Sequence, residues 1–397
     1  MDIQRRVLDQ ISKKEVVELL RELVQTPSVN PPGEEEEISL LVAGKLEAMG
    51  IEVRSVAVES NRPNIIGRLR GLDQGTSLIL NTHMDTVPPG DRKDWSFDPF
   101  SAKIKNNKVY GRGACDNKGS LTAMIMAASA IQKADVELKG DLLLTAVVDE
   151  ETGGEKGTKY LVDKGLIKGD MGIACGVSNL DKIYTASRGG VRLEITTKGK
   201  LAHAAMPHLG VNAVEKMAKV ILAVKELKLN HRPHRLLGGP TIAPGTLIEG
   251  GVKINVIPNT CKSSFDIRTV PGQSFDRVLD EFKECLHNLK QIDSEIKADV
   301  RVLRLTNPAE ISEKERIVQV ARDATTYVTG KKPKIAGIPG ATDARFLINQ
   351  AGIPTIVDFG PGKLDQCHVA NEHIEIDQVV DAAKIYALIV LKACGYQ

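Results

Sequence analysis

The chain has 397 residues, a length that favours two domains. Of these residues 42% are hydrophobic and 26% are charged, which is typical of a folded protein. Its 53 basic and 51 acidic residues leave a net charge of +2, and only 4% of residues are aromatic, which argues against a nucleic-acid partner. The N-terminus lacks the apolar core of a secretory signal, and no run reaches the about 18 apolar residues of a membrane span. Because the six cysteines are also scattered singly, we expect a cytoplasmic protein with free thiols and no membrane partner.

The first part of the chain alternates between helical and strand patterns. Apolar residues recur with a helical period in residues 13–26 and 36–49, and again from about residue 119. Short apolar runs that are typical of buried strands lie at 64–67, 77–80 and 142–148. Strand, helix and strand at this spacing predict crossover units and a mostly parallel sheet.

The middle of the chain follows a different pattern. Segments of alternating polarity between about 188 and 306 predict half-exposed antiparallel strands, and two helical patterns interrupt them at 211–228 and 274–290. From about 312 the chain returns to helix, strand and helix. We therefore expect an α/β domain formed by residues 1–187 and 307–397, with an α+β domain inserted at 188–306.

Acidic and imidazole side chains follow two of the predicted buried strands. His83 and Asp85 come after the run at 78–80, and because residues two apart share a face of an extended chain, they should point the same way. Asp149, Glu150 and Glu151 end the next strand. Turn-forming residues or a solvated loop would explain either group alone. Adjacent buried acids, however, are unfavourable unless a cation or strong donors neutralise them.

Two further stretches add candidate ligands. A glycine-containing loop at 111–119 presents Asp116 just before a predicted helix, with a spacing that fits neither a dinucleotide fingerprint nor a phosphate-binding loop. His368 follows a Gly-Pro-Gly turn near the C-terminus. A single histidine is more often structural, but together with the strand-end acids it completes a set of oxygen and imidazole ligands that suits Zn²⁺, Co²⁺ or Mn²⁺. The chain lacks the motifs of serine hydrolases and of HExxH metalloproteases.

Several motifs, in this order and spacing, resemble those of one family of zinc hydrolases: His83-Met84-Asp85, Gly111-Arg112-Gly113, Asp116-Asn117-Lys118-Gly119, Glu150-Glu151, His203-Ala204-Ala205-Met206-Pro207, Asn255-Val256-Ile257-Pro258, Asp266-Ile267-Arg268 and Cys367-His368. That family includes acetylornithine deacetylase, succinyl-diaminopimelate desuccinylase, aminoacylase and carboxypeptidase G. The resemblance implies a zinc-peptidase-like α/β domain with a mixed, mostly parallel central sheet flanked by helices. It also implies an inserted α+β lid domain through which two identical subunits pair.

The resemblance assigns metal ligands to this chain. Asp116 would bridge two ions, Glu151 and His368 would complete the first site, and His83 would bind the second. The expected cofactor is Zn²⁺, with Co²⁺ or Mn²⁺ as alternatives, at one or two ions per chain.

The resemblance also assigns catalytic roles. Asp85 would orient His83 from behind, as carboxylates commonly do for metal-binding imidazoles. Glu150 would be the general base that takes a proton from the attacking water and later delivers it to the leaving amine. His203 would reach the active site of the partner subunit and donate a hydrogen bond to the oxyanion there. Without the surrounding motif, His203 would be interpreted as an interface or loop histidine.

Three further residues resemble the family's substrate-binding groups. Arg268 and Asn255 would hold the substrate carboxylate, for which a guanidinium can supply two parallel charge-assisted bonds. On its alternating strand, Arg268 could equally be a solvated surface charge. Gly340 lies in a loop at the start of a predicted helix, where backbone N–H groups favour anions. The implied reaction removes an acetyl or succinyl group from a small N-acyl amino acid, and the alternative is a dipeptidase or carboxypeptidase that cleaves short peptides.

One position departs from the family pattern. The second metal site normally takes a glutamate from a Glu-Pro-Thr segment, and Gly176 stands there in this chain. Three explanations remain: Cys175 becomes a softer ligand, the second ion is weak or absent, or the chain is a catalytically impaired homologue that binds an amino-acid-like ligand. Glu150, His203 and Arg268 argue against the last, because a pure binding protein has no use for a general base. Asp116, Glu151 and His368 with water would still form a three-ligand zinc site.

Overall fold

The computed structural model describes residues 2–397, which divide into two compact units. The first unit comprises Met1–Thr185, Glu310–Ala336 and Thr342–Gln397, and the second comprises Ala186–Ala309 and Gly337–Ala341. Within residues 2–397, none of the helices has the length and apolar character needed to cross a bilayer.

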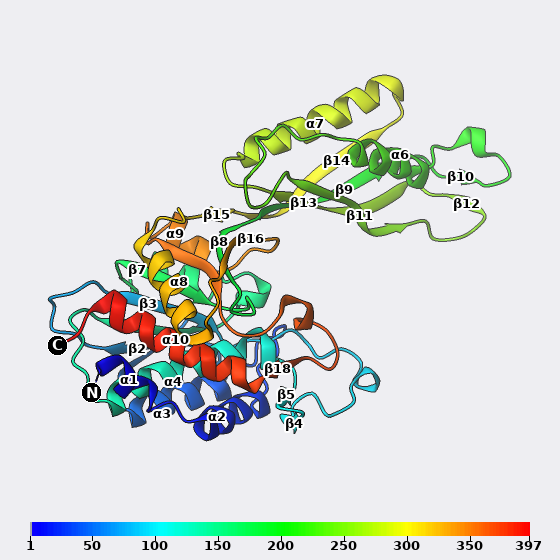
Figure 1. The fold of residues 1–397 in the computed structure, drawn as a ribbon. Helices are drawn as coiled ribbons and strands as arrows, with labels where there is room; N and C mark the ends of the chain where they lie inside the picture. Colours follow the sequence, from blue (N-terminus) through cyan, green and yellow to red (C-terminus); the bar gives the residue numbers. More distant parts are fainter. Residues whose placement is uncertain (1) are drawn as a thin grey trace. The chain divides into compact units, whose positions relative to one another are not determined.

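A mixed sheet organises the first unit (Figure 1). Its strands lie in the order β1 (Glu52–Ala57), β2 (Pro63–Leu69), β6 (Leu142–Val147), β3 (Leu78–His83), β7 (Met171–Cys175), β17 (Thr355–Phe359), β8 (Lys182–Ser187) and β15 (Ala309–Glu310), and β16 (Lys334–Ile338) pairs with β8. Pairing is parallel among β6, β3, β7 and β17, whereas β1 with β2, β2 with β6 and β8 with β17 are antiparallel. The predicted mixed sheet is confirmed. Its four parallel strands bring their carboxyl ends to one edge, where sheets of this type place their sites.

Helices cover both faces of this sheet. One face packs against α2 (Lys13–Gln25), α3 (Glu36–Ala48), α4 (Gly119–Lys133), α8 (Arg316–Thr329) and α10 (Ile376–Cys394), and the other against α5 (Thr158–Asp163) and α9 (Ala344–Asn349). The short helix α1 (Ile3–Leu8) contacts α10 and α4. Helices α4 and α10 are buried almost all round, which explains why their sequences are nearly uniformly apolar. Each fully buried leucine or isoleucine in this core contributes about 1.5–3 kcal/mol.

A small antiparallel sheet lies beside the glycine-containing loop of the first unit. Its strands are β4 (Lys103–Lys105), β5 (Lys108–Tyr110) and β18 (His373–Glu375), in the order β18, β5, β4. The pairing of β5 with β18 joins the segment before Asp116 to the segment after His368, although the two are far apart in the sequence. Two stretches that carry candidate ligands are thereby tied together.

The second unit is a four-stranded antiparallel sheet with two helices on one face, which confirms the predicted α+β fold (Figure 1). Its strands lie in the order β11 (Thr241–Gly250), β13 (Thr260–Thr269), β9 (Gly189–Lys198) and β14 (Lys297–Thr306), and its helices are α6 (Ala213–Lys225) and α7 (Phe275–Ile292). The predicted helix at 211–228 begins later, because the side chain of Asn212 caps it by accepting from the N–H groups of Val214 and Glu215. A short two-stranded arm, β10 (Ala202–His203) with β12 (Val256–Ile257), completes the unit.

Candidate metal centre

His83 is the last residue of β3 and its ring orientation is fixed from behind. Its Nδ1 lies 3.0 Å from the backbone carbonyl oxygen of Asp85. Because a carbonyl oxygen only accepts, Nδ1 donates the proton in this contact. That leaves Nε2, which lies 3.2 Å from Oδ1 of Asp116, as the nitrogen able to bind a cation when the ring is neutral.

The carboxylate of Asp85 contacts the turn after β6 as well as His83. It lies 3.4 Å from Nδ1 of His83, but its hydrogen bonds come from the side-chain amide of Asn30, at 2.8 Å, and from the backbone N–H groups of Glu150 and Glu151, at 3.2 Å each. Fully buried, Asp85 therefore orders the turn that carries both glutamates as well as the histidine. These backbone contacts were not anticipated from the sequence.

Asp116 stands between two imidazoles. Its Oδ1 lies 3.2 Å from Nε2 of His83, and its Oδ2 lies 3.4 Å from Nε2 of His368. The loop is held from below by Asn117, whose side-chain amide donates to Oγ1 of Thr82 and to the carbonyl oxygen of Cys175. Each oxygen of Asp116 thus faces a different histidine, the arrangement a bridging carboxylate requires.

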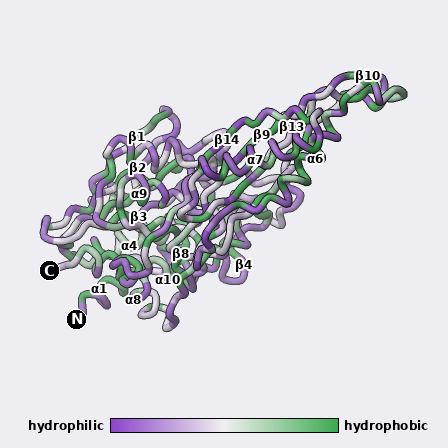
Figure 2. Tube along the Cα trace, turned by 90° about the horizontal axis from the view of Figure 1, so that it is seen from above, coloured by the Kyte–Doolittle hydropathy of each residue, from purple (hydrophilic) through white to green (hydrophobic). Residues whose placement is uncertain are grey.

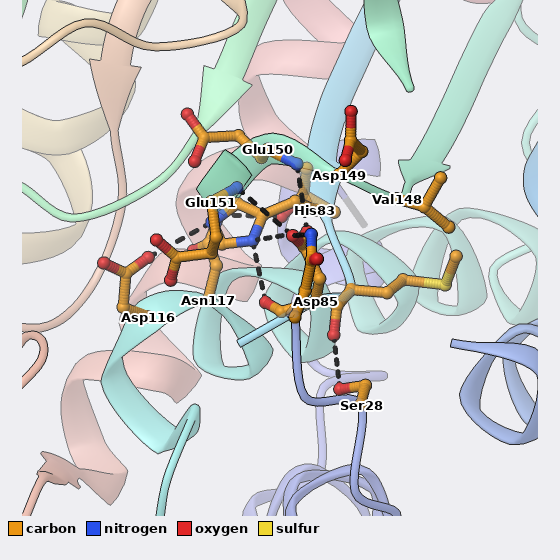
Figure 3. Close-up of polar contacts among 12 residues, drawn as sticks. Ser28, His83, Asp85, Asp116, Asn117, Val148, Asp149, Glu150 and Glu151 are labelled. Atoms are coloured by element: carbon orange, nitrogen blue, oxygen red, sulfur yellow. Dashed lines mark hydrogen bonds and ion pairs between the residues drawn. The ribbon is translucent and has the colours of Figure 1, made fainter. Parts of the chain in front are cut away.

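Glu151 and His368 meet on the other side of Asp116. The Nε2 of His368 lies 3.1 Å from Oε2 of Glu151, and His368 has a left-handed backbone with φ of 62°. Such a conformation is uncommon outside glycine, though histidine is among the residues enriched in it. Ligand atoms of His83, Asp116 and Glu151 all lie within 4.8 Å of one another. Figure 3 shows Asp116, Glu150 and Glu151 close to His83.

The cluster shifts the pKa values of its members. Contacts with Asp116 and Glu151 raise the pKa of His368 to about 10. Burial alone would lower the pKa of His83, but the neighbouring carboxylates of Asp116 and Asp85 outweigh it and raise the pKa well above its ordinary value. Burial opposes ionisation of Asp116, yet the two histidines lower its pKa.

These residues fit a divalent metal ion. Imidazole nitrogens with carboxylate oxygens are the ligand set of catalytic zinc sites, and Co²⁺ and Mn²⁺ accept the same donors. Burial raises the pKa of Glu151 as well, because its charged form is desolvated and lies near Asp116. A cation at this place would neutralise the crowded carboxylates and displace the protons that the imidazoles otherwise hold.

The three consecutive acids at the end of β6 have separate environments. Asp149 turns away from the cluster and accepts from Oγ1 of Thr152 at 2.6 Å, with Arg62 at 3.4 Å. Glu151 joins the cluster. Glu150 lies beside it in a buried environment that raises its pKa well above the ordinary value. The structure therefore separates a turn-forming acid from two acids at the centre, which the sequence did not distinguish.

Glu372 is a residue of this site that sequence reasoning missed. Fully buried, it accepts from the backbone N–H groups of Gly113, Cys115 and Asp116 at 3.0, 2.8 and 2.9 Å, and from Arg112 at 2.5 Å. Burial raises its pKa to about 7. The sequence places Glu372 only four residues after His368, but most of its partners are backbone N–H groups, which carry no side-chain signature.

Cys175 lies outside the cluster. Its thiol is buried in the apolar core beneath the sheet, 3.8 Å from the carbonyl oxygen of Ile173, and burial raises its pKa. The interpretation in which Cys175 takes the place of a carboxylate ligand is therefore wrong, because strand alternation points its side chain into the core.

The remaining candidate residues belong to the second unit, whereas the cluster belongs to the first. His203 ends β10, where its Nδ1 accepts from the N–H of Ala205 at 3.0 Å, and Asn255 directly precedes β12, where its carbonyl oxygen accepts from the N–H of Ala204. Arg268 lies on β13 with its Nε 2.6 Å from Asp266. No atom lies within 4 Å of the place a Cβ would take at Gly340, so nothing nearby requires glycine there.

Comparisons with known proteins agree with this architecture. A model of peptidase family M20/M25/M40 matches residues 79–392. The chain is 29% identical to N-formyl-4-amino-5-aminomethyl-2-methylpyrimidine deformylase of Bacillus subtilis, over 96% of this chain and 95% of that protein. It is 26% identical to a probable succinyl-diaminopimelate desuccinylase of Staphylococcus epidermidis, over 95% and 97% of the two chains.

Solved structures share the fold. The aminopeptidase PepT from Bacillus cereus superposes with a TM-score of 0.80 at 24% identity, over 97% of this chain and 99% of that one. The metallo-carboxypeptidase Sso-CP2 from Sulfolobus solfataricus gives 0.81 at 21% identity, over 96% and 99%. The chain therefore belongs to peptidase family M20/M25/M40 and is a metal-dependent hydrolase of linear amide or peptide bonds.

Proposed function

We propose that the protein removes an N-acyl group of the acetyl or succinyl type from an amino acid, with Zn²⁺ held by His83, Asp116, Glu151 and His368. The observation that carries the proposal is the convergence of imidazole and carboxylate atoms from four distant stretches of the chain. A deformylase and a probable desuccinylase among the relatives favour acyl removal over peptide cleavage.

The bound cation would supply Lewis acidity, polarising the scissile carbonyl and lowering the pKa of water. Glu150 accepts the proton of the attacking water and returns it to the leaving amine. Burial supports this role, because it raises the pKa of Glu150 well above its ordinary value, which makes this carboxylate a better acceptor of the water's proton. Asp85 accepts a hydrogen bond from the backbone N–H of Glu150 and so fixes the backbone position from which the side chain of the base extends.

The second unit supplies the substrate contacts of this proposal. Arg268 and Asn255 hold the substrate carboxylate, the loop that contains Gly340 offers backbone N–H groups to an anionic part of the substrate, and His203 donates to the oxyanion of the partner subunit's site. The ion pair with Asp266 supports the role of Arg268, because it holds the guanidinium in one orientation on the strand. A preorganised guanidinium loses little side-chain entropy when it binds a carboxylate.

A homodimer through the second unit belongs to the same proposal. β11 is an edge strand on which Leu247 and Ile248 are 71% and 57% exposed, and Val252 and Ile254 in the following loop are 91% and 99% exposed. Figure 2 shows apolar stretches in the arm around β10. An exposed edge with apolar side chains is a place where a second chain docks. The arm beside it carries His203.

The test is turnover on a panel of N-acetyl, N-succinyl and N-formyl amino acids and dipeptides, with Zn²⁺, Co²⁺ or Mn²⁺ added. Glu150→Ala should abolish hydrolysis of every active substrate while metal content stays at the wild-type level. Glu155→Ala, which changes an exposed acid of the following loop paired with Lys159, is the matched control and should keep full turnover. Near-wild-type turnover by Glu150→Ala would remove Glu150 as the base.

A further inference from the structure

Arg345 is a buried cation whose hydrogen bonds go to the backbone. It lies on α9 and is 5% exposed, and its Nη2 donates to the carbonyl oxygen of Gly153 at 2.6 Å while its Nη1 donates to that of Thr342 at 2.7 Å. The ion pair with Asp343 is long, at 3.8 Å between Nη1 and Oδ1, and the guanidinium lies over the ring of Phe346, 4.1 Å from its centre. Burying a charged group is unfavourable unless its donors are used, so the two carbonyl contacts fix where this side chain lies.

Gly153 ends the short helical turn that carries the proposed base. That turn, Glu150–Thr152, follows β6, and the N–H of Gly153 closes it by donating to the carbonyl oxygen of Glu150 at 2.9 Å. Asp85 accepts from the N–H of Glu150 at the beginning of the turn, whereas Arg345 donates to the carbonyl oxygen at its end. The last carbonyl groups of a helical turn have no partner within it, and a cationic side chain suits them. The backbone that carries the base is therefore held at both ends.

Asp343 fastens the start of α9 to β3. Its Oδ2 accepts from Oγ1 of Thr158 at 2.7 Å, and that hydroxyl in turn accepts from the side-chain amide of Asn81 at 3.1 Å. Asn81 lies on β3, two residues before His83. A Cβ at Gly154 would overlap Oδ1 of Asp343, so the start of α9 and the backbone after the turn lie as close together as only glycine allows. The start of α9 is thereby held in a fixed place relative to the metal cluster.

The charge of Arg345 also reaches Glu150. Burial raises the pKa of Glu150 most, and among the nearby charges Asp343 raises it whereas Arg345 lowers it. The guanidinium therefore lies in the neighbourhood of the base, and its two hydrogen bonds join it to backbone carbonyl groups. Its influence on where the Glu150 carboxylate lies passes through the turn.

We propose that Arg345 is a positioning residue for the general base: its guanidinium holds the end of the turn in the place from which the Glu150 carboxylate reaches the attacking water. A displacement of about 1 Å in a catalytic group can lower the rate about 100-fold, so the loss of this anchor should affect the chemical step more than substrate binding. The inference deepens the proposed function and rests on it, because it requires Glu150 to be the base.

Steady-state kinetics of the full chain at saturating Zn²⁺, with an N-acyl amino acid that the wild type hydrolyses, test the proposal. Arg345→Met keeps an apolar stem over Phe346 but removes every donor, and it should lower kcat about 10–100-fold with KM within about twofold of wild type and zinc content unchanged. Arg345→Lys keeps the charge but lacks the planar fork that spans two carbonyl groups, so its kcat should lie between the two values. The matched control is Arg316→Met. Arg316 also donates to backbone carbonyl oxygens, those of Lys392 and Ala393, but at the end of α10, and its loss should leave kcat unchanged.

The outcomes separate this inference from the proposed function. Wild-type kcat in folded Arg345→Met would overturn the role of Arg345, as would a raised KM at unchanged kcat or a loss of kcat that further Zn²⁺ restores, and the proposed function would stand. Near-wild-type turnover by Glu150→Ala would overturn both, because no base would remain to be positioned. Thermal denaturation shows whether each variant is folded. If Arg345→Met does not fold, Arg345→Lys decides: a lowered kcat at unchanged KM supports the proposal, and an unchanged kcat overturns it.

Discussion

Glu372 accepts a hydrogen bond of 2.9 Å from the backbone N–H of Asp116, although the two residues are 256 positions apart in the sequence. The same carboxylate holds two more N–H groups of the loop and the guanidinium of Arg112. Four hydrogen-bond donors on one buried carboxylate hold the backbone of the loop rigid at Asp116. The position of Asp116, a proposed metal ligand, therefore depends on a side chain that is not itself a proposed ligand.

Glu372→Gln should weaken both folding and metal binding. The change leaves Arg112, which is 2% exposed, without its anionic partner, and breaking a buried pair in this way lowers the free energy of unfolding by about 3–5 kcal/mol. We also expect a zinc affinity about 10–100-fold lower, because outer residues orient the ligands. Urea unfolding and zinc titration measure the two effects.

The control for Glu372→Gln is Glu375→Gln. Glu375 pairs with Lys108 at 3.1 Å in a more exposed place, so its loss should change the unfolding free energy by less than about 1 kcal/mol. If Glu372→Gln kept wild-type zinc affinity, the loop would not depend on this carboxylate.

Arg268→Ala should mainly raise KM for substrates that carry a free carboxylate. Removal of a guanidinium that binds the ground state and the transition state equally leaves kcat nearly unchanged. Arg192→Ala is the matched control, because Arg192 pairs with the same Asp266 at 3.2 Å and has no proposed contact with substrate. Steady-state kinetics decide: an unchanged KM in Arg268→Ala would remove it from the substrate site.

His203→Ala and Glu150→Ala should complement each other when subunits are mixed. Each homodimer is inactive, but in a hybrid the chain with an intact Glu150 receives an intact His203 from its partner. After equal mixing, about half of the dimers are hybrids and one of the two sites in each hybrid is intact, so up to about a quarter of wild-type turnover should return. Activity is measured before and after exchange of subunits. A mixture that stays inactive, despite proven exchange, would place His203 in its own chain's site or in none.

The ion pairs of Asp293 predict a pH dependence for the second unit. Hydrogen bonds from Lys219 and Lys216 lower the pKa of Asp293 to about 2, below the value of an unfolded chain. The stabilisation is therefore fully present above about pH 4 and is lost as the pH falls towards 2. Because solvent screens this pair, we expect less than about 1 kcal/mol.

Urea unfolding tests the role of Asp293. Asp293→Asn should be less stable than wild type at pH 7, and the difference should shrink as the pH falls below 4. Asp280→Asn changes an exposed acid on α7 and should match wild type throughout. A difference for Asp293→Asn that grows in acid would contradict the assignment.

The periodicity of apolar residues along the sequence predicted much of the fold correctly. The apolar runs that became β3 and β6, and the helical pattern that became α4, are buried because a parallel sheet covered on both faces needs continuous apolar strands. His83 ends β3 and Glu151 comes shortly after β6, so their convergence was predictable from strand direction. Local pattern was sufficient here because each residue's environment is set by the strand that carries it.

Contacts between distant segments could not be predicted in this way. Glu372 acts on backbone N–H groups more than 250 residues away, and such groups carry no side-chain signature in a sequence. Strand β17 is another example: it has one residue more than β7 between the pairs Ile356–Ile173 and Phe359–Cys175, an irregularity that the apolar run does not reveal. The prediction that Cys175 could bind the metal failed because strand alternation points its side chain into the core.

Metal removal and replacement tests the central claim most directly. Zinc content and hydrolysis of an N-acyl amino acid are measured on wild-type protein before chelation, after chelation and after return of Zn²⁺, beside Asp116→Ala treated in the same way. The account predicts that wild-type activity disappears with the metal and returns with it, and that Asp116→Ala neither binds zinc nor hydrolyses the substrate. Full turnover by metal-free wild-type protein, or wild-type zinc content in Asp116→Ala, would contradict it.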